Sequence, residues 1–238
     1  KESGIDPEAL FRNYIISTSG PSGRPVAMAT FIANAIAHGP DNWWWKYSNV
    51  LFHLVNGLLI FWLTALLFQA SPRKFFLDPW IPAVIVAGLW LLHPLQVSTV
   101  LYTVQRMTQL STLFVLAGLI SYVKGRLIQK KAVAAGWLFI GLGFLAFYPL
   151  GIMSKENALL FPVFCSLIEY LVFRFRGSRS TGRQVKMFHG ILLIGYFAAV
   201  LFVLTNFSSI VLDRYAIRDF TPTERALTQF RVIVMYLY

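Results

Sequence analysis

Hydrophobic runs long enough to cross a bilayer occupy most of the chain from Lys46 onward, and its basic residues are concentrated in alternate gaps between them. A run of about 17 to 25 apolar residues predicts a membrane-spanning helix. We therefore expect an all-α, polytopic transmembrane helical bundle of about seven spans. The expected spans are 47–69, 79–93, 108–123, 132–150, 157–173 and 187–206, with a seventh that begins near Phe230.

The charges between the spans predict their orientation. Counted from the segment before the first span, the second, fourth and sixth gaps hold eleven of the 21 Lys and Arg residues. The positive-inside rule makes these gaps cytoplasmic. The gaps at 94–107, 151–156 and 207–229 are then on the outer side. We expect an integral membrane protein. The basic residues of the cytoplasmic gaps are Arg73, Lys74, Lys124, Arg126, Lys130, Lys131, Arg174, Arg176, Arg179, Arg183 and Lys186.

Composition narrows the possible functions further. The chain is 57% hydrophobic and only 13% charged, and topology together with anionic headgroups accounts for its net charge of +11. We therefore predict no nucleic-acid partner. Cys165, the one cysteine, lies within an apolar run, so no internal disulfide is expected. The four histidines have no spacing typical of a metal site, and the motifs of soluble enzymes are absent. We predict neither metal nor cofactor.

The sequence divides into two predicted parts, 1–46 and 47–238. The first is an external loop with a short helix at 7–16, followed by an apolar segment at 24–37. That segment would be only about 21 Å long as a helix, against a hydrocarbon core of roughly 30 Å. We therefore expect it to lie in the outer interface. The second part is the transmembrane helical domain.

Polar side chains at membrane depth are the candidate functional residues, because they require partners or a watery cavity there. Asn49, His53 and Asn56 fall at helical spacing on one face of the first span. That face is either a stripe of interhelical hydrogen bonds or the lining of a cavity. Glu169, near the inner end of the fifth span, is expected to pair with Arg174 or Arg176.

The outer gaps hold the remaining candidates. Arg106 is either an anion-binding group or a simple charge at the outer interface. Lys155 and Glu156 precede the fifth span, where Glu156 is either a favourable first-turn acid or part of a site. His93 ends the second span and is followed by a proline.

Five motifs occur in an order that resembles a known family of membrane enzymes. The chain is similar, from Gly20 onward, to the membrane domain of the TMTC-type O-mannosyltransferases and their bacterial relatives, in which a multi-span domain is joined to tetratricopeptide repeats. The motifs are GPSGRPVAMATFIAN (20–34), YSNVLFHLVNGLLIF (47–61), LLHPLQVSTVLYTVQRMTQLSTLF (91–114), SKENALLFP (154–162) and RYAIRDFTPTERALTQFRVIVMYL (214–237).

The resemblance implies a GT-C glycosyltransferase fold. Such enzymes transfer a sugar from a polyprenyl-phosphate carrier to a Ser or Thr hydroxyl of a protein at the outer face. The matching positions imply that Arg24, Arg106 and Lys155 lie near the lipid phosphate. Asn49 and His53 are further candidates for substrate binding. The resemblance also implies a protein of the bacterial inner membrane with a periplasmic active face. Glu156 and His93 would support catalysis.

The family's general base is an acid of a pair on the first external loop. Glu2, Asp6 and Glu8 form no adjacent pair, so we expect that pair to precede Lys1. Two other functions remain open. One is a non-catalytic membrane anchor or assembly subunit of a larger complex, which the missing pair favours. The other is a transporter or polymerase of lipid-linked saccharides, which would need the same phosphate-binding residues.

Overall fold

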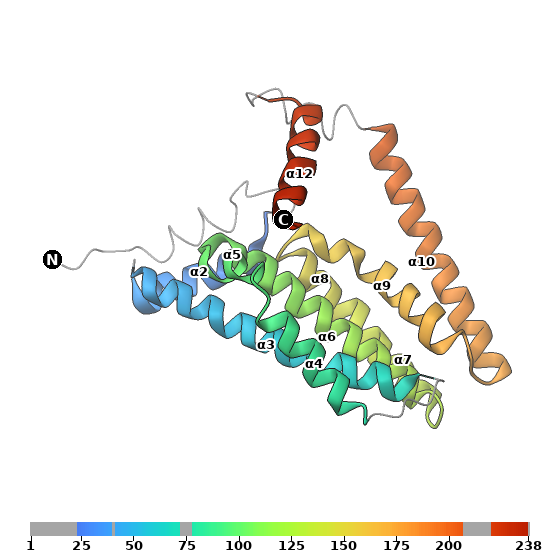
Figure 1. Ribbon diagram of the computed structural model, residues 1–238. Helices are drawn as coiled ribbons and strands as arrows, with labels where there is room; N and C mark the ends of the chain where they lie inside the picture. The colour runs from blue at the N-terminus through green and yellow to red at the C-terminus, as the bar shows by residue number, and fades with distance from the viewer. Residues whose placement is uncertain (1–22, 40, 72–77, 207–219, 238) are drawn as a thin grey trace. The chain divides into compact units, whose positions relative to one another are not determined.

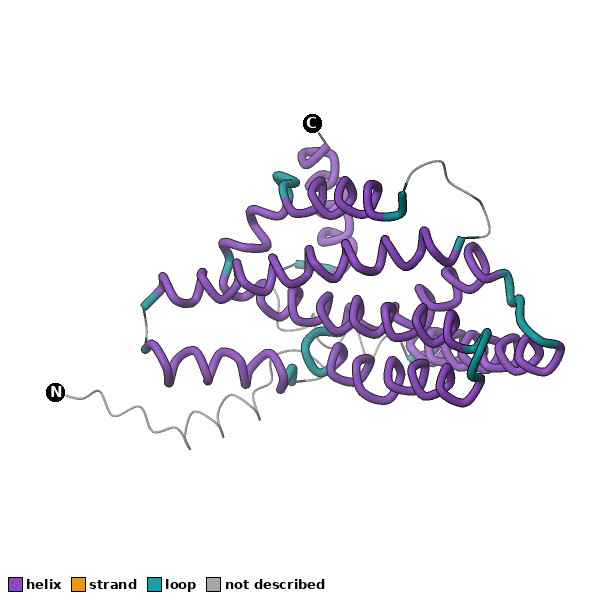
Figure 2. The backbone as a smooth tube through the Cα atoms, turned by 90° about the horizontal axis from the view of Figure 1, so that it is seen from below, coloured by secondary structure: helices purple, strands orange, loops and turns teal. Residues whose placement is uncertain are grey.

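The computed structural model of the chain describes residues 23–39, 41–71, 78–206 and 220–237. Within these ranges all regular structure is helical and no strand occurs, which confirms the predicted all-α class (Figures 1 and 2). The chain forms two units, residues 1–185 and 186–238. The predicted external loop with its short helix at 7–16, the pair Arg73 and Lys74, and most of the outer gap at 207–229 lie outside the described residues.

The first unit contains nearly all of the helices. In chain order they are α2 (Pro25–His38), α3 (Asn42–Ala70), α4 (Trp80–Leu91), α5 (Gln96–Leu101), η1 (Thr103–Gln105), α6 (Arg106–Ile128), α7 (Val133–Leu142), the π-helical η2 (Gly143–Phe147), α8 (Tyr148–Ile152), the 3-10 helix η3 (Glu156–Leu160), α9 (Phe161–Ile168) and the π-helical η4 (Glu169–Phe173). Helix α10 (Arg179–Thr205) begins in this unit and continues into the second, which also holds α12 (Pro222–Leu237).

Five helical stretches of the described residues are long and apolar enough to cross a membrane: Asn42–Ala70, Thr103–Ile128, Val133–Ile152, Glu156–Phe173 and Ser180–Thr205. Each contains most of one predicted span. The expected span at 79–93 is instead the 12-residue helix α4, about 18 Å long, because the helix ends before His93 and Pro94. Helix α2 has 14 residues and falls short of a span, as its apolar length predicted.

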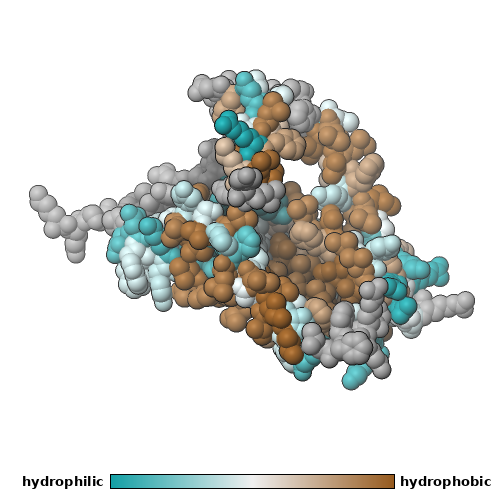
Figure 3. Space-filling view, viewed as in Figure 1, coloured by the Kyte–Doolittle hydropathy of each residue, from teal (hydrophilic) through white to brown (hydrophobic). Residues whose placement is uncertain are grey.

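In the first unit several polar side chains are buried, and many apolar side chains are exposed. Asn49, Asn56 and Glu169 are at most 1% exposed, whereas Leu138 and Leu145 are 73% and 83% exposed. Hydrophobic residues cover the middle of the visible face in Figure 3. Such a distribution suits hydrocarbon, because apolar side chains lose nothing by facing lipid while polar groups need partners.

Helix α6 is the centre of the unit and packs against α3, α7 and α8. Its contact with α7 is close because both helices have glycine there. A Cβ on Gly136 would lie 2.7 Å from the carbonyl oxygen of Gly125 and 2.2 Å from Cγ of Gln129. Small residues of this kind let membrane helices approach without a hydrophobic driving force.

The ends of the helices gather in two groups, which we name by the predicted orientation. At the outer end, side chains of α6 bond the backbone of α2 and α3, and the turn after α8 meets the start of α2. At the inner end, residues from the ends of α3, α6 and η4 and the starts of α7 and α10 line one cavity. This grouping follows the alternation of spans expected from the sequence.

Candidate functional site

The start of α2 and the turn between α8 and η3 meet at the outer end. Val26 N–H donates to the carbonyl oxygen of Met153 at 3.2 Å. Just before α2 the backbone is left-handed at Gly23 and Arg24, with φ of 67° and 52°. Glycine adopts this conformation readily but arginine rarely does, so packing must hold Arg24 in it. The turn sets the direction in which the Arg24 side chain leaves the chain.

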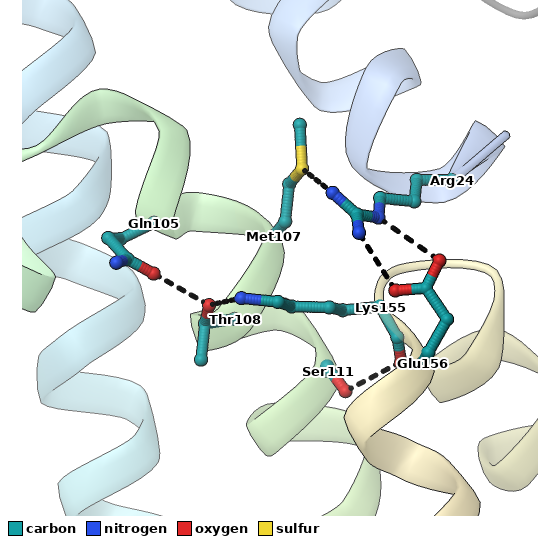
Figure 4. A network of polar contacts seen from close by, with 7 residues as sticks. All are labelled: Arg24, Gln105, Met107, Thr108, Ser111, Lys155 and Glu156. Carbon is teal, nitrogen blue, oxygen red and sulfur yellow. Dashed lines mark hydrogen bonds and ion pairs between the residues drawn. The ribbon is translucent and has the colours of Figure 1, made fainter. Parts of the chain in front are cut away.

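Arg24 forms an ion pair with Glu156. Its Nη2 lies 2.9 Å and its Nε 3.4 Å from the two carboxylate oxygens, so both nitrogens of one edge donate (Figure 4). Nη1 contacts the sulfur of Met107 on α6 at 3.4 Å. The two charged side chains are 23% and 26% exposed, so the pair is reachable from solvent.

Lys155 lies beside this pair and reaches along α6. Its Nζ donates to Oγ1 of Thr108 at 2.6 Å, and Thr108 donates in turn to Oε1 of Gln105 at 2.8 Å. Ser111 donates to the backbone carbonyl of Lys155 at 3.2 Å (Figure 4). Among the described residues Lys155 has no ion-pair partner. We call Arg24, Thr108, Lys155 and Glu156 the outer cluster.

The environment of Lys155 disfavours its charged form. Burial lowers the pKa of the Lys155 ammonium below its usual value, and the nearby positive charge of Arg24 lowers it further, against an opposing effect of Glu156. A bound anion would offset these lowering effects, because its negative charge stabilises the ammonium form. The site is therefore one where binding of a negative group and protonation of Lys155 favour each other.

Arg106, the other candidate phosphate ligand, is 1% exposed, and all three of its guanidinium nitrogens donate to protein groups. Its Nε donates to Asn49 at 3.1 Å, and Nη2 donates to Asn34 and to the carbonyl of Trp45, each at 2.9 Å. Nη1 donates to the carbonyl of Thr30 at 3.2 Å. The guanidinium also lies over the rings of Phe31 and Trp45, at 4.7 and 5.5 Å. It ties α2, α3 and α6 together.

The polar face of α3 bonds neighbouring backbone. Asn49 donates to the carbonyls of Val100 and Tyr102, and Asn56 donates to that of Gln109. Nε2 of His53 lies 3.0 Å from the carbonyl of Leu91, and its ring stacks on Trp90. Of the two interpretations left open by the sequence, the interhelical hydrogen-bond stripe is the one observed. The bonds of Asn49 and His53 satisfy carbonyls at the ends of α4 and α5, whereas the bond of Asn56 joins α3 to α6.

His93 is exposed in the turn between α4 and α5, where its Nδ1 accepts from Leu95 N–H at 3.2 Å. Its described hydrogen bonds stay within that turn, so none joins it to the outer cluster. The structure brings together three of the predicted residues, Arg24, Lys155 and Glu156. Arg106 and Asn49 belong to the neighbouring buried network, whereas His53 bonds the end of α4.

Glu169 does not pair with Arg174 or Arg176 as expected. Its carboxylate accepts from Nε and Nη2 of Arg126 at 2.7 and 2.9 Å, and from the hydroxyl of Tyr122 at 2.6 Å. The π-helical turn of η4 and the left-handed backbone at Arg174 carry the chain away from the helix axis. Arg126 instead reaches Glu169 from α6, and the pair is buried.

The sequence did not single out Thr108, Gln105 and Met107 as parts of the site, or Asn34 and Trp45 as ligands of Arg106. One signal was present, since polar residues interrupt the apolar run at the start of α6.

No protein-family model matches this chain, and neither a curated protein nor a solved structure shows significant similarity to it.

Proposed function

We propose that the chain is the membrane domain of a glycosyltransferase that takes a sugar from a polyprenyl-phosphate carrier and transfers it to a protein Ser or Thr hydroxyl at the outer face. The observation that carries this proposal is the outer cluster. Two cations and one carboxylate, from segments far apart in sequence, converge on one end of a bundle with an apolar exterior.

Lys155 is the group we assign to the lipid phosphate. During transfer the acceptor oxygen bonds to the anomeric carbon while the bond from that carbon to the phosphate oxygen breaks. Negative charge therefore accumulates on the phosphate, and an ammonium group in a half-buried site stabilises it. Nε and Nη2 of Arg24 donate to the carboxylate of Glu156, which holds the guanidinium in place. Arg24 would bind the same phosphate from the side of α2.

Glu156 positions Arg24 in this scheme, and we do not assign it the acceptor proton. The general base expected from the family resemblance is an acid of a pair on the first external loop, outside the outer cluster. Arg106 acts as a structural group, because its donors are directed at Asn49, Asn34, Thr30 and Trp45. No metal or cofactor enters this scheme, and the lipid-linked sugar is the donor substrate.

The proposal is tested by binding of farnesyl phosphate, a short polyprenyl phosphate, to the purified chain, with farnesol as the uncharged comparison. We expect preferential binding of the phosphate, weakened about tenfold or more in Lys155→Met, by analogy with loss of a charge-assisted hydrogen bond. Lys46→Met is the matched control, because Lys46 is exposed near the outer end of α3 and outside the cluster. Equal affinity for farnesol and farnesyl phosphate would refute the assignment.

One observation favours a second function, that of a non-catalytic membrane anchor or assembly subunit. Arg24 and Glu156 neutralise each other and link α2 to η3, which is what a purely structural brace would do. In that case Glu156→Gln would lower stability while farnesyl phosphate would bind neither the wild type nor the variant.

A further inference from the structure

A cavity of about 540 Å³ opens at the inner end of the first unit, distant in sequence from the outer cluster. It lies where α3 and α6 end and where α7 and α10 begin. Its walls combine apolar side chains, among them Val133 and Phe173, with amides, hydroxyls and cations. Its volume is within the range of ligand sites and much larger than one small ion needs.

Gln129 in the wall of this cavity has a hydrogen-bond donor with no acceptor. The residue is 5% exposed, and its Oε1 accepts from Nη1 of Arg126. Arginine has no acceptor, so the amide must present its oxygen to Arg126 and its NH₂ group the other way. Among the described residues Nε2 of Gln129 has no partner. A buried donor left unsatisfied is costly, so the site lacks an acceptor.

The charge of the cavity indicates what that acceptor is. Lys130, Lys131 and Arg176 line it and are exposed, whereas no acidic residue is among its described lining residues. Arg126 also lines it, but Glu169 neutralises that guanidinium at 2.7 Å. The cavity is therefore positively charged and suited to an anion.

The first turn of α10 adds neutral donors to the same wall. Ser178 and Thr181 line the cavity, and the backbone N–H of Thr181 donates to Oγ of Ser178 at 3.3 Å. This is the arrangement of a helix N-cap, whose exposed N–H groups and positive dipole end favour anions.

Membrane topology alone explains part of this pattern. The positive-inside rule accounts for cations at this end, and cations also stabilise the C-terminal end of α6. Neither effect requires a cavity, or a buried amide donor that lacks an acceptor among the described residues. The combination of Gln129, the cations and the hydroxyls goes beyond what topology requires.

We propose that the inner-end cavity binds a phosphate-bearing anion, with Gln129 and Lys130 as ligands, supplied either as the headgroup of an anionic phospholipid or as free phosphate. The apolar wall would accommodate the glycerol end of a lipid. The site is separate from the outer cluster and does not depend on glycosyl transfer.

The test is native mass spectrometry of the full chain in neutral detergent, with phosphatidylglycerol and phosphatidylcholine added separately. We expect adducts with phosphatidylglycerol to be favoured, and Gln129→Glu to weaken them about tenfold, because it replaces a donor by a negative charge while Arg126 keeps its acceptor. Gln184→Glu is the matched control. It makes the same change on α10, where Gln184 is exposed and accepts from Trp137 outside the cavity lining.

A second pair of variants guards against a folding defect in Gln129→Glu. Lys130→Gln should weaken the phosphatidylglycerol adducts, whereas Arg183→Gln, which removes an exposed charge outside the lining, should not. Sodium phosphate, compared with sodium chloride at equal ionic strength, identifies the source. If phosphate stabilises the protein against heat and displaces the lipid, the natural ligand is the free anion. If phosphate does neither, the ligand is the lipid headgroup. Equal binding of the two lipids without phosphate stabilisation, or variants that bind like wild type, would overturn the proposal.

Discussion

Arg24 and Glu156 lie 132 positions apart, yet Nη2 of Arg24 is 2.9 Å from a carboxylate oxygen of Glu156. The pair joins the start of α2 to the start of η3, beside the ammonium group of Lys155 (Figure 4). Because these side chains remain partly exposed, the ion pair contributes little to stability by itself. Its main effect is to fix the position of a guanidinium next to a lysine whose pKa is lowered.

The two ends of the bundle should face opposite sides of the membrane. Lys131 is exposed at the inner end and Asn157 at the outer end. In right-side-out vesicles an impermeant maleimide should label Asn157→Cys and leave Lys131→Cys unlabelled until the membrane is opened. Cys165 is fully buried and should give no background. Labelling of both variants from the same side would show that the assigned orientation of α6 and η3 is wrong.

The contact between α6 and α7 should be sensitive to a single methyl group. Gly136→Ala would bring Cβ to 2.2 Å from Cγ of Gln129 and 2.7 Å from the carbonyl of Gly125, so we expect a loss of about 1–3 kcal/mol in unfolding free energy. Gly141→Ala is the control on the same helix, since a Cβ there meets nothing within 4 Å. The control should be neutral or slightly stabilising when both are measured by reversible unfolding in mixed micelles.

Arg106 should determine stability. Arg106→Lys replaces a planar fork by a compact ammonium group that cannot reach all four acceptors, and each buried acceptor left unpaired costs about 1–3 kcal/mol. We expect a lowered melting temperature, with unchanged affinity for farnesyl phosphate below the melting transition. A variant that melts like wild type but no longer binds the phosphate would instead make Arg106 a ligand.

Binding at the outer cluster should depend on pH through Lys155. Its pKa lies below the ordinary 10.5, so the unfolded chain binds more protons between the two values and stability rises with pH in that interval. Phosphate binding has the opposite dependence, because the anion favours the protonated ammonium. Affinity for farnesyl phosphate should be full below the lowered pKa and fall as pH rises through it. Lys155→Arg stays charged, so its affinity for farnesyl phosphate should not fall in this pH range. If the affinity of Lys155→Arg still falls, the titrating group is not Lys155.

The sequence predicted the features that depend on apolar length and charge. Five of the expected spans, the all-α class and the burial of Cys165 agree with the structure. The expected span at 79–93 is the shorter helix α4, and the expected seventh span is not among the candidate spans of the described residues. The i, i+4 spacing of Asn49 and His53 predicted that they share one helix face. The sequence did not indicate which groups these two side chains bond. Those partners are carbonyls of α4 and α5 exposed by local helix breaks, which leave no pattern of their own.

Pairings between distant helices were the hardest to predict. Glu169 was matched with the arginines nearest in sequence, whereas the π-helical turn of η4 and its left-handed exit direct it to Arg126 on α6. The Arg106 site combines α2, α3 and α6, so no local spacing indicates it. In the outer cluster the charged members could be chosen by residue type, but Thr108 is identified only by the three-dimensional contact with Lys155.

Sugar transfer itself tests the central claim most directly. The measurement is the initial rate of transfer from a polyprenyl-phosphate mannose to a Ser- and Thr-containing acceptor peptide by the full-length protein. Loss of the Lys155 ammonium should reduce the rate about 10²–10³-fold in Lys155→Met, as for removal of one oxyanion-type donor, while Lys46→Met keeps the wild-type rate. A Lys155→Met enzyme that transfers at the wild-type rate, or a wild-type protein that binds the donor without transfer, would contradict the account.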